Sequence, residues 1–143
     1  MTPETNRENL LKVAQADHES ILSVTENVFR FIGCPDSPDA AKEFHTTQRL
    51  INEVLGNHFT YEENQLFPSL LAHNSDAQTT QVIAKLRQEH TSLLEQARLF
   101  SEKFAGGYNL DERRDELWQT TTHLVSALEN HVAKEERLFE SFA

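Results

Sequence analysis

The sequence predicts an all-α protein that folds as an up-down-up-down antiparallel four-helix bundle. Only 4 Gly and 4 Pro occur in 143 residues, which is low for a β-rich or disordered chain. Three short turn sequences interrupt the chain, and the four long segments that they separate are rich in good helix formers. Short connections between long helices place neighbouring helices antiparallel. The length suits a single domain, residues 1–143, with one sizeable core.

The turn sequences set the bounds of the four predicted helices. They are GCPDSP at 33–38, AHNSDA at 72–77 and GGYNLD at 106–111. Pro38 suits the first turn of the second helix, and Asp76 and Asp111 are N-cap candidates for the third and fourth. Pro68 is expected to kink or end the second helix, because proline lacks the N–H that a helix interior uses.

Apolar residues recur at helical spacing in all four segments. They are Leu11, Ala14, Leu22, Thr25 and Phe29 in the first, Phe44, Ile51, Leu55 and Leu66 in the second, Ile83, Leu86, Leu94, Ala97 and Phe104 in the third, and Leu117, Leu124, Leu128, Leu138 and Phe142 in the fourth. Each set falls on one side of a helix with about 3.6 residues per turn. The four apolar faces predict one shared core. Trp118 and the remaining Phe residues are expected in the core or at its boundary.

The charge and the cysteine count limit the function classes. With 23 acidic and 13 basic residues, the formal net charge is -10, which disfavours nucleic acid or an anionic membrane as the main partner. Cys34 is the one cysteine, so an intrachain disulfide and a cysteine-built metal site are set aside. The N-terminus is polar and no run of about 18 apolar residues occurs. The expected compartment is the cytoplasm.

A motif of one His and two Glu occurs twice. The two stretches are NHFTYEENQLF at 57–67 and NHVAKEERLF at 130–139. At about 100° per residue, His58 and Glu62 lie about 40° apart on one helix face. His131 and Glu135 have the same spacing in the second stretch. Each motif therefore presents an imidazole and a carboxylate on the same side of its helix.

Two further histidines complete the pattern. His18 and His90 lie on the apolar stripes of the first and third helices, within the similar sequences DHESIL and EHTSLL. Counted from the turns at about 1.5 Å per residue, all four histidines fall at a similar height near the middle of the bundle. Six polar side chains are thus expected to converge on one buried layer.

Metal binding accounts for this layer better than ordinary packing does. A lone His on an apolar stripe is more often a hydrogen-bonded core residue than a ligand, and a lone His-x-x-x-Glu is mostly a surface pair. Two carboxylates buried together without a partner are costly, and a metal removes that cost. Four imidazoles and two carboxylates suit iron, manganese or zinc better than calcium or magnesium. Two histidines for each ion, with Glu62 and Glu135 shared, predict a two-metal site.

Several other polar residues are set aside as ligands. Glu63 and Glu136 are turned about 140° from the histidines of their own helices and are expected in solvent. His45 is expected at the surface, His73 in an exposed loop and His123 at the core boundary. Tyr61 is expected to pack, with a role beside the metal as the alternative. These assignments, together with the lone thiol of Cys34, leave the catalytic residues unspecified.

In their order along the chain, the six residues resemble the hemerythrin-like HHE cation-binding domain. The pattern is His18, His58-x-x-x-Glu62, His90 and His131-x-x-x-Glu135, each on its own helix. The resemblance extends over nearly the whole chain, and it implies a non-haem centre of two iron ions bridged by the two Glu carboxylates and an oxo or hydroxo group. The oxygen-carrying hemerythrins have a further His four residues after the third-helix His, where this chain has Leu94. Their last carboxylate follows its His by five residues, and here the spacing is four.

The resemblance implies a small molecule as the partner of the centre, namely oxygen, nitric oxide or peroxide. Three alternatives stay open: a protein that stores, donates or senses iron, a di-iron enzyme with peroxidase- or oxidase-like turnover, and a structural bundle with zinc or an empty site. Iron is favoured over zinc or manganese. Whether the chain is an enzyme, and its oligomeric state, are left open.

Overall fold

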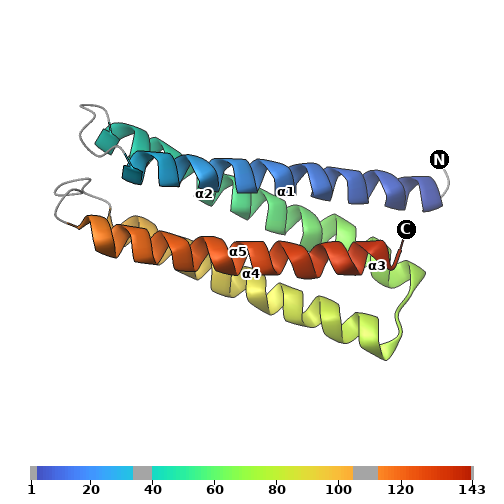
Figure 1. Ribbon diagram of the computed structural model, residues 1–143. Helices are drawn as coiled ribbons and strands as arrows, with labels where there is room; N and C mark the ends of the chain where they lie inside the picture. Colours follow the sequence, from blue (N-terminus) through green and yellow to red (C-terminus); the bar gives the residue numbers. More distant parts are fainter. Residues whose placement is uncertain (1–2, 34–39, 105–112, 143) are drawn as a thin grey trace.

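The structure is a computed structural model that describes residues 3–33, 40–104 and 113–142, without the side chains of 3–5, 27–33, 40–48, 50, 51 and 114. Its elements are α1 (Pro3–Gly33), α2 (Ala40–Tyr61), the π-helical turn η1 (Glu62–Leu66), α3 (Phe67–His73), α4 (Ala77–Lys103) and α5 (Arg114–Glu140). Because α2, η1 and α3 follow one another without a break, the described residues form four helical rods (Figure 1). The predicted all-α four-helix bundle is confirmed.

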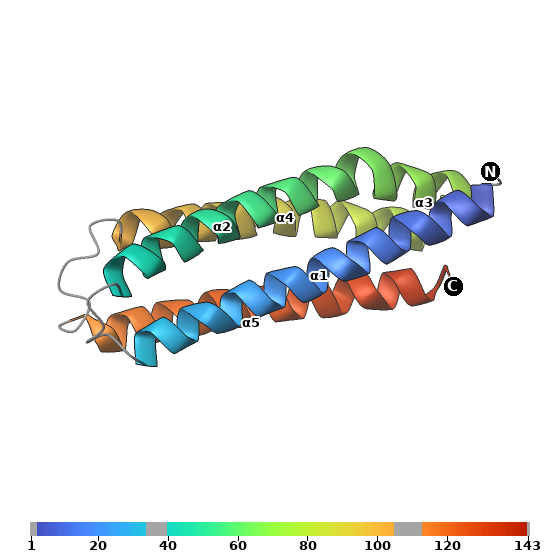
Figure 2. The same ribbon diagram turned by 90° about the horizontal axis from the view of Figure 1, so that it is seen from above.

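The four rods run alternately up and down and pack in the cyclic order α1, α2, α4 and α5. Two views at right angles show each rod between its two neighbours, with α1 next to both α2 and α5 (Figures 1 and 2). The first turn of α1 and the last turn of α5 lie at the same end of the bundle. The short turn predicted between the second and third helices is the one between α3 and α4.

The described helix start at α4 follows the sequence-based expectation. The carboxylate of Asp76 accepts a hydrogen bond from the backbone N–H of Thr79 at 2.7 Å, as an N-cap residue does. This hydrogen bond lowers the pKa of the Asp76 carboxyl group. The other two residues expected at helix starts, Pro38 and Asp111, lie outside the described residues.

Pro68 does not end its rod, but the regular α-helix is interrupted directly before it. It lies in the first turn of α3, directly after the π-helical turn, in which the N–H of Phe67 donates to the carbonyl of Glu62. Proline cannot donate to the carbonyl four residues before it, and its ring crowds that carbonyl. A π-helical turn is wider than an α-helical one, and its position just before Pro68 lets the helical path continue to His73.

The π-helical turn also absorbs a difference in length between the two repeated motifs. Between the double Glu and the Leu-Phe pair, the first motif has Asn64 and Gln65, and the second has only Arg137. A π-helical turn holds one residue more than an α-helical turn. Phe67 therefore returns to the buried position that corresponds to that of Phe139 in α5.

Buried apolar residues form two clusters. The first consists of Ile21, Leu55, Phe59, Leu93, Ala97, Phe100, Phe104, Leu117, Leu124 and Leu128, and the second of Leu11, Ala14, Leu66, Phe67, Leu70, Ile83, Leu86, Leu138, Phe139 and Phe142. In each of the four rods, the metal-ligand candidate His lies between residues of the first cluster and residues of the second. The polar layer is thus closed by apolar side chains on both of its sides.

Most of the predicted apolar positions whose side chains are described are buried, with two corrections. Leu94 is 37% exposed, because its neighbour Leu93 takes the buried position about 100° away on the helix. Trp118 is 50% exposed for the same reason, with Leu117 buried beside it. Of the remaining predicted core residues, Leu22 is half-buried. The side chains of Phe29, Phe44 and Ile51 lie outside the description.

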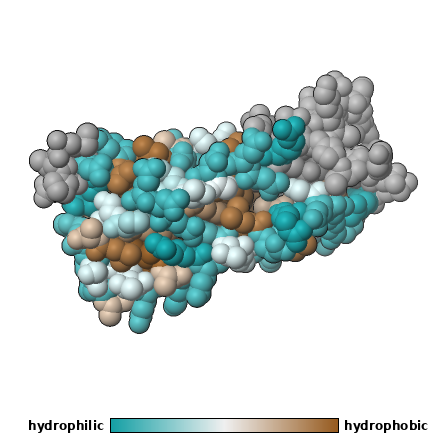
Figure 3. Space-filling view, turned by 180° about the vertical axis from the view of Figure 1, so that it is seen from behind, coloured by the Kyte–Doolittle hydropathy of each residue, from teal (hydrophilic) through white to brown (hydrophobic). Residues whose placement is uncertain are grey.

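One face of the outer surface can be described by its hydropathy. Hydrophilic side chains cover most of the face seen from behind, with apolar groups in smaller patches (Figure 3). Among the described helices, none combines the length and the apolar character that a bilayer crossing needs.

Candidate metal centre

The structure brings the six predicted ligands together in one buried layer. Each of the four rods supplies one His, and two rods also supply a Glu: His18 from α1, His58 and Glu62 from the rod of α2 and η1, His90 from α4, and His131 and Glu135 from α5. All six residues are at most 2% exposed. The equal heights counted from the turns therefore correspond to real proximity.

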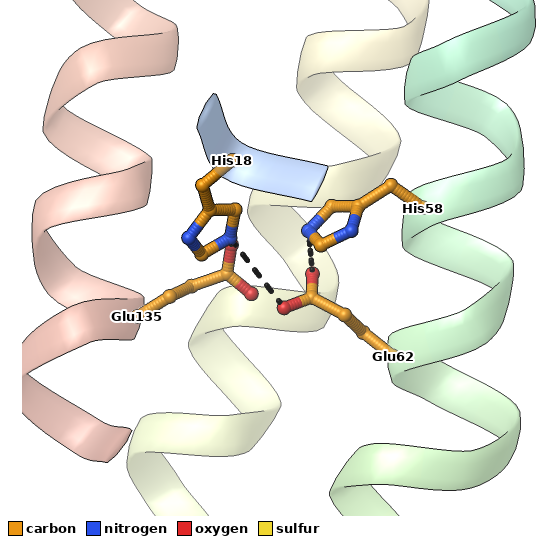
Figure 4. A group of neighbouring side chains, drawn as sticks. All are labelled: His18, His58, Glu62 and Glu135. Carbon is orange, nitrogen blue, oxygen red and sulfur yellow. Dashed lines mark hydrogen bonds and ion pairs between the residues drawn. The ribbon is translucent and has the colours of Figure 1, made fainter. Parts of the chain in front are cut away.

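Each His-x-x-x-Glu motif forms a close pair within its own rod. The Nε2 atom of His58 lies 3.2 Å from Oε1 of Glu62, and Nε2 of His131 lies 3.0 Å from Oε1 of Glu135. The two Glu side chains extend from opposite rods towards each other, and the imidazoles of His18 and His58 face them (Figure 4). The two motifs thus present their carboxylates to a common centre.

The other two histidines reach across the bundle. Nε2 of His18 lies 3.2 Å from Glu135 and 3.9 Å from Glu62. Nε2 of His90 lies 3.1 Å from Glu62 and 3.7 Å from Glu135. Both carboxylates are therefore within reach of imidazoles from both helix pairs, α1 with α2 and α4 with α5.

Buried polar atoms in this layer lack hydrogen-bond partners among the described residues. They are Nε2 of His58, His90 and His131, both carboxylate oxygens of Glu62, and Oε2 of Glu135. The atoms approach one another without the alignment of a hydrogen bond. Each unsatisfied buried group costs about 1–3 kcal/mol, and a cation among them would remove that cost. The donor set therefore fits a metal.

The ligand atoms form two groups, each with all its atoms within 4.8 Å of one another. One group is His18, His58, Glu62 and Glu135, and the other is Glu62, His90, His131 and Glu135. Both carboxylates belong to both groups, and each carboxylate has two oxygens. Each group can hold a metal ion, and its mixture of imidazole and carboxylate suits a first-row transition metal.

Every imidazole also meets an acidic side chain on its outer side, through Nδ1. His58 Nδ1 lies 3.0 Å from Asp17, and His18 Nδ1 lies 2.7 Å from Glu136. Since a carboxylate can only accept, an Nδ1–H donates outwards and leaves the Nε2 lone pair free to point at the centre. These two contacts therefore hold both histidines in the tautomer that a metal requires.

The second group has the equivalent outer residues at different distances. His131 Nδ1 lies 2.8 Å from Glu89, which also forms a 2.7 Å ion pair with Lys134. His90 Nδ1 lies 3.5 Å from Glu63 and is buried without a hydrogen-bond partner among the described residues. Glu63 and Glu136 were expected in solvent and without a role at the centre, but they are only partly exposed. They are 37% and 35% exposed, and each faces an imidazole of a neighbouring rod.

The four outer carboxylates, Asp17, Glu63, Glu89 and Glu136, were missed because the angles were measured only within single helices. A sequence signal does exist, since each of them is adjacent in the chain to one of the six inner residues. An acidic residue next to a ligand in the chain points about 100° away from that ligand around the helix. In a bundle, this places the acidic side chain towards the next rod.

The family model of the hemerythrin HHE cation binding domain matches residues 9–143. The chain belongs to this family. The match includes the two ligand groups and all four outer carboxylates. No curated protein and no solved structure matches the chain. A buried cluster of His and Glu is consistent with the cation binding that gives the family its name.

The carboxylates of the layer favour proton binding by the histidines of this hemerythrin HHE domain. Burial lowers the pKa of His18, but the hydrogen bond and charge of Glu135, with Glu136, outweigh it and raise the pKa to about 9. Burial likewise lowers the pKa of His90, and Glu135 and Glu62 raise it to about 9. Burial and the neighbouring Glu135 raise the pKa of Glu62. Because ligands must be deprotonated, cation binding releases these protons.

Phenylalanine rings fix two of the imidazole planes. Phe139 stacks on His18 with ring centroids 5.8 Å apart, and Phe67 stacks on His90 at 5.7 Å. Phe67 and Phe139 play equivalent parts because the π-helical turn brings Phe67 to the position that corresponds to Phe139. Phe59 lies on the His90 ring at 4.0 Å. The His90 ring is therefore held by apolar stacking from two side chains.

The residues set aside as ligands stay outside the centre of the HHE domain. His73 and His123 are exposed, the latter against the expectation of a boundary position. The side chain of His45 and the whole of Cys34 lie outside the description. Tyr61 is half-buried, and its hydroxyl donates to the backbone carbonyl of Leu10 at 2.8 Å. Burial, with the nearby charges of Asp17 and Glu62, raises the Tyr61 pKa to about 12.

Proposed function

We propose that this hemerythrin HHE domain binds two iron ions in a non-haem centre and uses it to handle oxygen, nitric oxide or peroxide. The observation that carries the proposal is the presence of two four-residue ligand groups that share both carboxylates. Glu62 and Glu135 would bridge the ions, and two histidines would bind each ion. Manganese and zinc are compatible with the same donor atoms but are not favoured over iron.

The protein residues define what such a centre can do. Four imidazoles and two carboxylates would hold the ions, while three of the outer carboxylates keep the Nε2 atoms of His18, His58 and His131 directed inwards. Two divalent ions with two bridging carboxylates leave a net charge of about +2, which the outer carboxylates offset. Bound iron would supply the redox chemistry and the affinity for a diatomic molecule or peroxide. The two apolar clusters limit the water that reaches the layer.

The proposal is tested by metal analysis and spectroscopy of protein purified in air. Elemental analysis should give about two iron per chain, and the visible spectrum should show the absorption of a bridged diferric centre. The reduced protein should then change its spectrum on exposure to oxygen, nitric oxide or peroxide. His123→Ala is a control that should keep the metal content of the unmodified protein, because His123 is an exposed histidine of the same helix as His131. Zinc at both sites, or one ion per chain, would contradict the proposal.

The same measurements separate the alternative functions. A protein that stores or donates iron should lose its iron readily to a chelator and show little response to the small molecules. A di-iron peroxidase or oxidase should consume peroxide or oxygen repeatedly in the presence of a reductant. Stable iron with a single, reversible spectral change supports small-molecule binding without turnover.

A further inference from the structure

We infer that the two ions are held unequally, so that the ion of the His18–His58 group binds first and the ion of the His90–His131 group is the exchangeable one. This inference rests on the proposed two-ion centre. The inner ligands do not explain such a difference, because each group has two histidines and the same two carboxylates. The difference lies in the outer contacts of the imidazoles.

In the His18–His58 group, both imidazoles are fixed from outside. Glu136 accepts from His18 Nδ1 at 2.7 Å, and Asp17 accepts from His58 Nδ1 at 3.0 Å. An outer carboxylate orients its imidazole and makes Nε2 a stronger donor to a metal. Both ligands of this group are therefore prepared for metal binding before an ion arrives.

In the other group, His90 lacks this support. Its Nδ1 lies 3.5 Å from Glu63 and is buried without a hydrogen-bond partner among the described residues. The rings of Phe59 and Phe67 hold its plane by stacking, but they accept no Nδ1 proton in that plane. On its outer side, the His90 imidazole is therefore positioned mainly by packing, and its Nε2 is a weaker donor than those of the other three.

The weak contact lies at the π-helical turn. Glu63 is the second residue of η1, whereas its counterpart Glu136 lies in the uninterrupted helix α5. The extra residue of the first motif widens the helix at this point and changes the path of Glu63 relative to that of Glu136. The insertion restores the stacking of Phe67 but leaves Glu63 too far from His90 for a hydrogen bond.

The outer contact of His131 is weakened in a second way. Glu89 divides its two oxygens between His131 and the ammonium group of Lys134, at 2.8 and 2.7 Å. Its counterpart Asp17 approaches His58, and Glu136 shares its carboxylate with the neutral amide of Gln15 at 3.5 Å. The positive charge of Lys134 therefore partly neutralises the carboxylate of Glu89 that supports His131. In the first group, neither outer carboxylate is described with such a cation beside it.

The outer contact of His131 also borders a concave surface. An open hollow of about 710 Å³ lies between α4 and α5, and both Glu89 and Lys134 line it. The hollow therefore exposes the outer carboxylate of His131 to solvent, whereas His90 and His131 themselves do not line it.

The test is a stepwise metal titration of the chelated protein without oxygen, with Co²⁺ as the probe ion. Native mass spectrometry should show a clear population with one ion before the second binds. Paramagnetic NMR at one equivalent should show shifted imidazole N–H signals from His18 and His58. Appearance of the His90 or His131 signals first, or of two ions without a one-ion species, would overturn the inference. Failure to bind two ions at any concentration would instead refute the two-ion centre.

A matched pair of variants tests the cause. Asp17→Asn should weaken the first binding step by about 10- to 100-fold, the usual effect of losing an outer partner of a ligand. Glu63→Gln likewise removes one negative charge, here from the carboxylate that lies 3.5 Å from His90. It should leave the first step unchanged and weaken the second step by less than about 10-fold. Equal weakening of the first step by both variants would overturn the inference. Circular dichroism of both proteins checks that the bundle is intact.

Discussion

Glu136 lies 2.7 Å from the Nδ1 atom of His18, although the two residues are 118 positions apart in the chain. Helical geometry turns Glu136 away from His131, the ligand candidate of its own helix, and towards the neighbouring α1. The same arrangement relates Asp17 to His58 and Glu89 to His131. In this bundle, the acidic residues next to the ligands support histidines of adjacent rods.

Glu136→Gln should weaken metal binding without unfolding the protein. The variant keeps the shape of the side chain but removes the charge that orients His18, so the affinity should fall about 10- to 100-fold. The measurement is competition for Co²⁺ or Fe²⁺ with a coloured chelator of known affinity. Glu129→Gln is the matched control, because Glu129 is an exposed Glu of the same helix. If both variants bind as the unmodified protein does, Glu136 has no role beside the ligand.

The shared carboxylates should matter more to metal content than any one histidine. Glu135→Ala removes ligand atoms from both groups, whereas His90→Ala removes one from a single group. We expect fewer than one ion per chain in the Glu135 variant and about one in the His90 variant, after gel filtration and elemental analysis. Equal metal content in the two variants would contradict a centre in which Glu135 bridges both ions.

The stability of the chelated protein should fall as the pH rises from about 6.5 to 9. The folded chain raises the pKa of His18 and His90 from 6.5 to about 9, so it binds protons that the unfolded chain releases. A raised pKa contributes stability that is complete below the unfolded value and is lost as the pH passes the folded value. Thermal unfolding in excess chelator measures this trend.

A variant identifies the groups responsible for the pH dependence. His18→Gln cannot take up the proton, so its melting temperature should depend less on pH between 6.5 and 9 than that of the unmodified protein. His73→Gln changes an exposed histidine at the end of α3 and should leave the slope unaltered. A chelated protein that becomes more stable across this interval would show that the layer binds no protons.

The sequence was sufficient to predict the four rods and the residues of the inner layer. Both depend on periodicity and on distances counted along single helices, and these are nearly the same in every bundle. The position of Glu62 four residues after His58 is an example, since the wider turn begins only at Glu62. Such features need no knowledge of how one rod is rotated against another.

Other features depend on rotation and local irregularity. The contact between Glu136 and His18 requires the relative rotation of two rods, which the spacing within either rod does not determine. The π-helical turn arises from one extra residue in the first motif, and the difference is visible only when the two stretches are aligned with each other. Leu94 and Trp118 were misplaced because a shift of one residue moves a side chain by about 100°.

Metal should stabilise the fold, and the unsatisfied atoms of the layer explain why. Both oxygens of Glu62 and Nε2 of three histidines are buried without hydrogen bonds among the described residues. A ligand that binds only the native state raises its stability by about 2.7 kcal/mol at a concentration 100 times its dissociation constant. The loaded protein should therefore melt at a higher temperature than the chelated protein in the same buffer at neutral pH.

A variant that removes the metal centre but keeps the four rods serves as a control for this comparison of melting temperatures. In Glu62→Gln/Glu135→Gln, the charges that hold the ions are absent, so added Fe²⁺ should no longer raise the melting temperature. Equal melting temperatures for loaded and chelated unmodified protein would show instead that protons satisfy the layer as well as metal does.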